Sequence, residues 1–163
     1  MNKTIQPQKL KGFRDFFAED IAIREYVINT FKSVFEKYGY EPLETPALEY
    51  SDIFVKESGE EASKLFYRFK DEGGRDIMLK YEVMISMCRA VAENIDTIVF
   101  PYKRYQIQTV WRAEKPQKGR YREFTQCDAD TIGSASMISE AEFIQMGIEA
   151  LKKLGFKKFR VNM

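Results

Sequence analysis

Apolar residues recur at helical spacing in three stretches of the chain. Over residues 18–38 they follow one another at intervals of three and four, which predicts an amphipathic helix with one buried face. The same spacing predicts helices over residues 82–93 and 139–154. The expected buried positions are Ile23, Val27, Phe31, Val34, Phe35 and Tyr38; then Val83, Met87, Cys88 and Val91; then Ala141, Ile144, Ile148, Leu151 and Leu154.

Local signals mark the ends of these helices. Gly39 follows the first helix and Gly155 the last, at the position where glycine accepts the left-handed backbone that ends a helix. Ser139 and Glu142 have the spacing of a capping box, in which each side chain bonds to the backbone N–H of the other residue. This spacing predicts that the last helix begins at Ser139.

Strict alternation of apolar and polar residues predicts strands between the helices. Residues 65–81 form two short strands around a turn that contains two adjacent glycines. Residues 103–112 and 121–133 alternate on either side of the loop 113–121, which predicts a long hairpin with an unusually large tip. The weaker predictions are an extended segment over 40–54, a short helix or a mobile loop over 57–64, and a last strand over 156–163.

These elements define the expected fold class. Strands that are neighbours in the sequence mostly pair as hairpins, so we expect an α+β fold in which helices flank an antiparallel β-sheet. The chain has 163 residues, of which 44% are hydrophobic, and these include 13 Phe and 9 Tyr. This is enough apolar material for one core, so a single domain over residues 1–163 is predicted.

Composition excludes several kinds of chemistry. The chain has no His, which rules out Ser-His-Asp and Cys-His catalysis, and its two cysteines do not form a CxxC pair, so no protein metal site is expected. Cys88 and Cys127 are expected to be reduced thiols, as in a cytoplasmic protein. No signal peptide or membrane span is predicted. The net charge of +1 means that any anion-binding site must be local.

The stretch Trp111–Phe124, W-R-A-E-K-P-Q-K-G-R-Y-R-E-F, is such a local concentration of positive charge. It holds five cations and two carboxylates. Arg112 lies at the end of one predicted strand, Arg120 and Arg122 lie at the return, and Phe124 follows on the same alternation. Arginines beside a ring favour a nucleotide, whose phosphates and base they would hold. The alternative is a basic loop that is simply solvated.

A second polar cluster follows on the same strand. Gln126, Asp128 and Asp130 alternate, so their side chains share one face of the predicted sheet. Three polar side chains are poor core material. The face is therefore either exposed to solvent or the floor of a pocket for a polar ligand.

The same residues carry a family resemblance. W-R-A-E, K-P-Q-K-G-R-Y-R-E-F and T-Q-C-D-A-D resemble motif 2 of class II aminoacyl-tRNA synthetases, over about residues 103–133, and specifically the histidyl-tRNA synthetase family. Residues 11–20 resemble the opening K-G-x-R-D of that family, about 19–50 its motif 1, and 58–82 the hairpin that follows. The fold implied is a partial class II catalytic core.

The resemblance implies an activity and a role for each matching residue. The family activates histidine with ATP and Mg²⁺ as histidyl-adenylate and transfers it to tRNA(His), as a cytoplasmic homodimer that pairs through motif 1. Arg112 matches the catalytic arginine at the ATP α-phosphate. The other implied ATP-binding residues are Glu114, Arg120 and Phe124, and the implied amino-acid-binding residues are Glu82, Gln126 and Asp130.

Two departures from the family leave alternatives open. In residues 79–89, Lys80, Met84 and Ser86 stand where the family has Arg, Thr and Pro, so the amino-acid pocket is expected to be altered. Motif 3 and the anticodon-binding domain find no counterpart in these 163 residues, so weak or absent activity is expected for the chain alone. The alternatives are a histidine-binding regulatory subunit of ATP phosphoribosyltransferase, and a minimal core that keeps only ATP binding.

Overall fold

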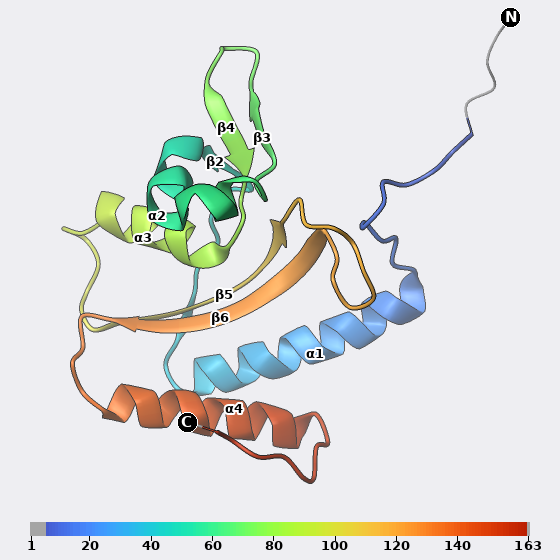
Figure 1. Ribbon diagram of the computed structural model, residues 1–163. Helices are drawn as coiled ribbons and strands as arrows, with labels where there is room; N and C mark the ends of the chain where they lie inside the picture. The colour runs from blue at the N-terminus through green and yellow to red at the C-terminus, as the bar shows by residue number, and fades with distance from the viewer. Residues whose placement is uncertain (1–5, 163) are drawn as a thin grey trace, which may run out of the picture. The chain divides into compact units, whose positions relative to one another are not determined.

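A computed structural model describes residues 6–162, with the side chains of residues 57–62 left aside. Figure 1 shows the elements in chain order. They are α1 (Ala18–Lys37), β1 (Glu41–Pro42), β2 (Leu48–Tyr50), α2 (Ser51–Ser63), β3 (Arg68–Lys70), β4 (Asp76–Leu79), α3 (Val83–Glu93), β5 (Tyr102–Trp111), β6 (Glu123–Ile132) and α4 (Ile138–Lys153). The prediction of an α+β fold with antiparallel pairing and flanking helices is confirmed.

The contacts group the chain into two compact units, which we describe separately. Within the described residues, the first unit consists of residues 6–15, 46–82 and 109–125, and the second of residues 16–45, 83–108 and 126–162. Each strand of the long hairpin therefore contributes residues to both units. The prediction of a single partial catalytic domain stays a prediction.

The first unit is built on a small antiparallel sheet with the strand order β2-β4-β3. The predicted turn between β3 and β4 forms, and its Gly74 has a φ of +77°, a left-handed value that glycine adopts without strain. Phe54 of α2 packs edge-on against Phe66, with ring centroids 6.3 Å apart. Met78 of β4 is fully buried. These residues form apolar packing within the first unit.

The second unit contains the sheet β1-β5-β6 and the helices α1 and α4, which lie side by side on one face of it (Figure 1). β5 and β6 run in opposite directions, as the hairpin predicts. β1 pairs with β5 in parallel, which the sequence pattern did not predict, because the two strands lie about 60 residues apart and share no hairpin. The core residues are Val34, Phe35, Tyr40, Tyr105, Met146 and Ala150.

The predicted apolar stripes are only partly buried. In α1, Val34 and Phe35 are buried, whereas Ile23 and Val27 are exposed. In α4 the most buried residues are Met146 and Ala150, and Ala141 is exposed. In α3, Cys88 is exposed, while Val83, Met87 and Val91 are buried as predicted. A helix buries only the part of its stripe that meets a neighbouring element, and periodicity does not contain that information.

Three local predictions are wrong. No capping box forms at the start of α4: the helix begins at Ile138, and its N-cap residue Met137 makes no side-chain cap hydrogen bond. Ile138 N–H instead donates to Ser136 Oγ at 3.3 Å. Residues 51–54 begin a helix, α2, although an extended segment was expected there. Residues 156–162 form no strand, because no strand of the described residues pairs with them. Gly39 and Gly155 do end α1 and α4, with φ of +78° and +93°.

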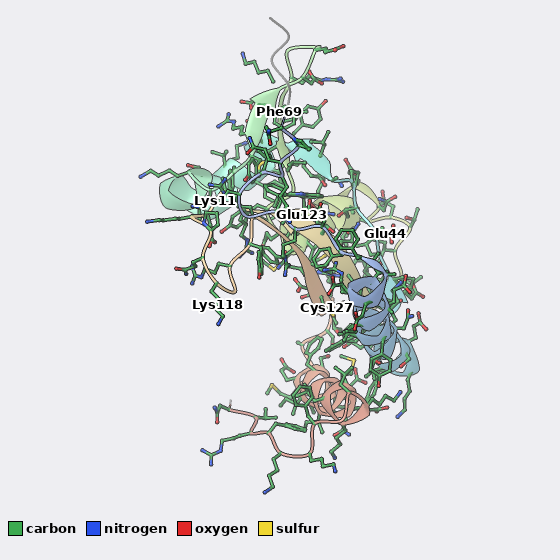
Figure 2. All side chains as sticks on the ribbon, turned by 90° about the vertical axis from the view of Figure 1, so that its right-hand side faces the viewer. Lys11, Glu44, Phe69, Lys118, Glu123 and Cys127 are labelled. Atoms are coloured by element: carbon green, nitrogen blue, oxygen red, sulfur yellow. The ribbon has the colours of Figure 1, made fainter. Side chains whose placement is uncertain are left out.

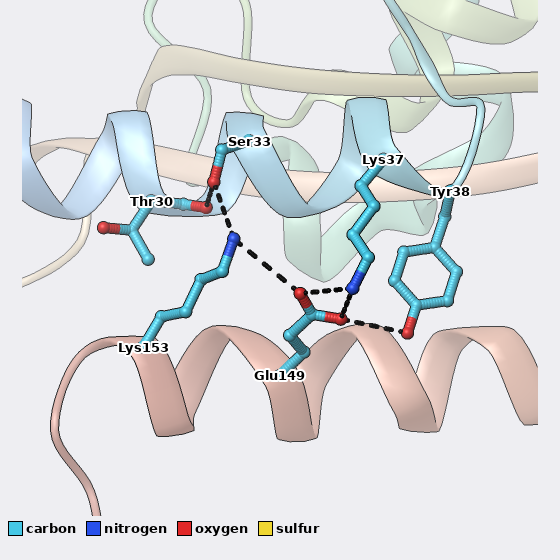
Figure 3. A network of polar contacts seen from close by, with 6 residues as sticks. All are labelled: Thr30, Ser33, Lys37, Tyr38, Glu149 and Lys153. Atoms are coloured by element: carbon cyan, nitrogen blue, oxygen red, sulfur yellow. Dashed lines mark hydrogen bonds and ion pairs between the residues drawn. The ribbon is translucent and has the colours of Figure 1, made fainter.

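A polar network joins α1 to α4 on the outer side of this core (Figure 3). Both carboxylate oxygens of Glu149 accept hydrogen bonds from Lys37 Nζ, at 2.9 and 2.8 Å. Tyr38 donates a further hydrogen bond to Glu149, at 3.2 Å, and Lys153 lies 3.7 Å away. The hydrogen bond to Lys37 holds the pKa of Glu149 below its ordinary value, and the same bond raises the pKa of Lys37.

The network predicts an acid-dependent contribution to stability. Because the folded-state pKa of Glu149 is depressed, its contribution is present above the ordinary Glu pKa of about 4.3 and is lost as the pH falls below that value. We expect Glu149→Gln to lower the melting temperature at pH 7, and we expect its difference from the unmodified chain to shrink as the pH falls below the ordinary Glu pKa. Thermal melting followed by circular dichroism measures this. Glu25→Gln, at an exposed α1 position with no ion pair in the described residues, is the control, and equal melting shifts for both variants at pH 7 would contradict the assignment.

Candidate nucleotide-binding site

Backbone hydrogen bonds order the loop at the tip of the long hairpin. Arg112 N–H donates to the carbonyl of Arg122 at 2.9 Å, so the strands remain paired up to the loop. Gln117 and Arg120 exchange backbone hydrogen bonds across a tight turn at Lys118 and Gly119, where Gly119 has a φ of +80°. Figure 2 shows Lys118 at the tip, with its side chain pointing away from the ribbon.

Arg112 is held in one orientation by its neighbours in the first unit. Its Nε donates to the carbonyl oxygen of Tyr81 at 3.2 Å. Its guanidinium carbon lies 4.4 Å from the ring centroid of Tyr81 and 5.1 Å from that of Phe124. No described residue accepts a hydrogen bond from its two terminal nitrogens. The arginine is therefore pre-oriented with donors available for an anion.

A cavity of about 330 Å³ opens beside this arginine. The lining residues all belong to the first unit and are Arg112, Glu114, Gly119, Arg120, Tyr121 and Phe124. Arg120 is mostly exposed and forms an ion pair with the partly buried Glu114, at 3.4 Å. The structure thus brings together all four residues that the family resemblance assigns to ATP.

Arg122 does not line this cavity, although the sequence places it among the same cluster of cations. Its Nε donates to the carbonyl of Glu114 at 2.9 Å, and its backbone N–H donates to the carbonyl of Gly12 at 2.8 Å. A Cβ added at Gly12 would lie 2.9 Å from Arg122 Cγ, and Gly12 has a φ of +92°, so only glycine fits there. Arg122 therefore ties the segment around Gly12 to the backbone of the loop.

The sequence did not predict two contacts at this loop, that of Arg14 with Tyr121 and that of Glu123 with Trp111. The guanidinium of Arg14 lies 3.3 Å from the ring centroid of Tyr121, a residue that lines the cavity. Glu123 accepts a hydrogen bond from the Trp111 indole at 2.7 Å and so serves the base of the loop. The K-G-F-R-D stretch was recognised as a family feature, but nothing in its pattern shows that Arg14 stacks on a residue more than 100 positions away.

The residues assigned to the amino acid fall in different units. Glu82 belongs to the first unit, whereas Gln126 and Asp130 belong to the second. Gln126 Oε1 accepts a hydrogen bond from Val83 N–H at 3.2 Å and so satisfies a donor at the start of α3. Asp130 forms an ion pair with Arg104, a fully buried residue that the sequence reading did not single out as functional.

The three positions that depart from the family have unlike environments. Lys80 and Ser86 are buried, and Met84 is half exposed on the first turn of α3. Lys80 belongs to the first unit, and its backbone carbonyl accepts a hydrogen bond from Trp111 N–H at 2.9 Å. Its main chain thus supports the end of β5, directly before Arg112.

The side chains around the cavity show how a magnesium ion could bind there. Within residues 6–162, no group of three or more acidic or thiol side chains could hold a metal ion by itself. Glu114 supplies one carboxylate at the edge of the cavity. Magnesium commonly binds through one or two carboxylates together with substrate phosphates, so this arrangement fits an ion that arrives with a nucleotide.

Comparisons with known proteins agree on the class of fold. The histidyl-tRNA synthetase family model matches residues 12–163. A histidine–tRNA ligase from Treponema denticola is 45% identical over 163 residues, which are 100% of this chain and 36% of that protein. The histidyl-tRNA synthetase of Nostoc sp. PCC 7120 superposes with a TM-score of 0.79 at 25% identity, over 90% of this chain and 34% of that one.

A further solved structure supports the fold alone. It is described as an ATP phosphoribosyltransferase regulatory subunit/histidyl-tRNA synthetase from Bacillus halodurans. It superposes with a TM-score of 0.85 at 24% identity, over 98% of this chain and 41% of that one. The chain spans about a third of the length of the curated relatives that it matches, 36% for that of Treponema denticola.

The fold and the arginine-lined loop define part of a class II aminoacyl-tRNA synthetase catalytic core. The family match over residues 12–163 identifies which family of this class the chain belongs to. This chain belongs to the histidyl-tRNA synthetase family. None of the helices in the described part of the chain combines the length and apolarity that a bilayer crossing requires.

Proposed function

We propose that this chain binds ATP in the cavity beside the β5–β6 loop, as the ATP-binding part of a histidine–tRNA ligase. The observation that supports this best is that one cavity is lined by all four side chains that the family assigns to ATP, which are Arg112, Glu114, Arg120 and Phe124. Membership of the family supports the choice of ATP over other anions.

The chemistry of amino-acid activation suits these residues. The carboxylate of histidine attacks the α-phosphorus of ATP, an oxygen–phosphorus bond forms, and pyrophosphate leaves with the electron pair of the broken bond. No proton has to be removed, so the protein acts by positioning the reactants and stabilising charge. Magnesium, when bound with the nucleotide, neutralises charge on the leaving pyrophosphate.

Each cavity residue has a part in this proposal. Arg112 donates to the α-phosphoryl oxygens, where negative charge builds up, and its contacts with Tyr81 and Phe124 keep it oriented. Phe124 offers its ring to the adenine, and Arg120 contacts the outer phosphates. Glu114 contacts the adenine end or the metal ion. The fixed arginine costs little reorganisation during the reaction.

The amino-acid half of the proposal is carried by Glu82, Gln126 and Asp130. Carboxylates suit the α-ammonium group and the imidazole N–H of histidine. Gln126 keeps its amide N–H groups available, because its oxygen is the atom that bonds to Val83. The family resemblance implies this group of three.

The regulatory subunit of ATP phosphoribosyltransferase remains the second candidate. The exposed Met84, which replaces a Thr whose hydroxyl belongs to the amino-acid pocket in the family, favours it. The presence of all four ATP residues that motif 2 supplies favours the ligase, since a regulator has no need of them. We therefore rank the ligase first.

Binding and exchange measurements on the chain test both candidates. We expect calorimetry to detect binding of ATP with magnesium, and the fluorescence of Trp111, the only tryptophan, to report it from the residue next to Arg112. Histidine-dependent exchange between ATP and pyrophosphate would support the ligase. Stimulation of an ATP phosphoribosyltransferase without exchange would support the regulator. Absence of any ATP binding would refute the proposal.

The partners of the family extend the proposal. We propose tRNA(His) as the acceptor and the motif 1 region, about residues 19–50, as the site of homodimerisation. The exposed apolar side chains Ile21, Ile23 and Tyr26 on α1 support a protein contact there. A cytoplasmic location is part of the same proposal.

A further inference from the structure

Arg104 is a buried cation to which the proposed function assigns no role. It lies on β5 in the second unit and has an exposed fraction of 0%. It forms an ion pair with Asp130 of β6, whose side chain is 36% exposed. Burial lowers the pKa of Arg104 below its ordinary value, and the charges of Asp130 and Asp128 oppose that shift.

The pair is only partly satisfied within the protein. Among residues 6–162, no hydrogen-bond partner is found for Nε, Nη1 or Nη2 of Arg104, so its contact with Asp130 through Nη2 is an ion pair only. The same holds in that range for Oε1 of Gln106, which is two residues along β5 and therefore on the same face. Most buried polar atoms in native proteins are bonded, and a group that is not bonded calls for an explanation, such as a bound water or ion or a functional role.

A buried arginine of this kind is not expected to add to the free energy of folding by itself. Its desolvation is costly, and a buried ion pair can often be replaced by apolar residues without loss of stability. Here the carboxylate partner is the more exposed member and belongs to the residues assigned to the amino acid. The pair therefore links the interior of the sheet to a candidate ligand-binding carboxylate.

We infer that Arg104 is a positioning residue for the amino-acid site, which holds Oδ2 of Asp130 and leaves Oδ1 to accept a hydrogen bond from a cationic or N–H group of histidine. This inference rests on the proposed function. The guanidinium fixes the carboxylate in one rotamer, so less side-chain freedom is lost when the ligand binds.

The inference is tested by measuring the binding of L-histidine and of ATP separately, by calorimetry, for the unmodified chain and three variants. Arg104→Met keeps an unbranched apolar side chain and removes the charged guanidinium. Arg104→Lys keeps the charge and removes the guanidinium fork. Lys103→Met is the matched control, since Lys103 directly precedes Arg104 on β5 and pairs at 2.7 Å with Glu142 instead.

We expect Arg104→Met to weaken histidine binding about tenfold or more, as for a lost charge-assisted contact, with no change for ATP. Arg104→Lys should recover part of that loss, and Lys103→Met should bind both ligands as the unmodified chain does. If Arg104→Met does not fold, Arg104→Lys alone decides, because it should still bind histidine less tightly than the unmodified chain.

The contrary outcomes separate this inference from the proposed function. Suppose that the unmodified chain binds histidine and that Arg104→Met binds it equally well. That result would overturn the role of Arg104 only. Where only Arg104→Lys folds, the same conclusion follows if that variant binds histidine as tightly as the unmodified chain. Equal losses for histidine and ATP would also overturn it, because they indicate general damage to the fold. Absence of histidine binding by the unmodified chain would overturn the amino-acid half of the proposed function, and this inference with it.

Discussion

Replacing Arg112 by alanine is expected to weaken ATP binding by about 10- to 100-fold, the range that corresponds to losing a hydrogen bond between charged groups. Arg112 is the only residue of the cavity whose guanidinium is fixed by both a backbone carbonyl and two rings in the described part of the chain. Its terminal donors are therefore oriented before the nucleotide arrives. Calorimetric titration with ATP and magnesium measures the effect.

Two companion variants show whether the loss comes from the phosphate contact. Arg112→Lys keeps the charge but loses the two-pronged geometry, so its affinity should fall between those of the alanine variant and the unmodified chain. Lys118→Ala removes a cation from the tip of the same loop, outside the cavity lining, and should leave the affinity nearly unchanged. If Arg112→Ala binds ATP as well as the unmodified chain, the phosphate role is wrong.

The cavity could be anticipated from the sequence because its residues are close together in one hairpin. Arg112 and Phe124 sit on two strands whose alternation is plain, and the loop between them is short enough to return Arg120 to the same place. Local periodicity and a family resemblance were sufficient here. The same reasoning grouped Arg122 with the phosphate contacts, which is not where its side chain lies.

Contacts between distant segments could not be anticipated in this way. Arg14 stacks on Tyr121, and Arg122 bonds to the carbonyl of Gly12, across more than 100 residues in both cases. The pairing of Arg104 with Asp130 depends on the register of β5 against β6, which a one-residue slip would abolish. Alternation assigns a side chain to a face, but not to a partner.

Phe35→Ala is the substitution with the largest expected effect on stability. Phe35 is 7% exposed, and its ring centroid lies 5.3 Å from that of Tyr105 and 5.9 Å from that of Phe31. Removing a buried phenyl ring leaves a cavity and typically costs about 3–5 kcal/mol. Total stabilities of about 5–15 kcal/mol are usual, so the variant should be close to unfolding at room temperature. Urea unfolding followed by far-ultraviolet circular dichroism measures the change.

Ile23→Ala on the same helix is the matched control. The sequence gives Ile23 and Phe35 the same status, as members of one apolar stripe, but Ile23 is 60% exposed in the structure. Measured at protein concentrations at which the chain is monomeric, its replacement should change the free energy of unfolding by no more than about 0.5 kcal/mol, because little apolar surface leaves a packed environment. If the two variants were destabilised equally in the isolated chain, the whole stripe would be buried, as periodicity alone suggests. A large difference between them instead locates the core at the C-terminal half of α1, where α4 packs against it.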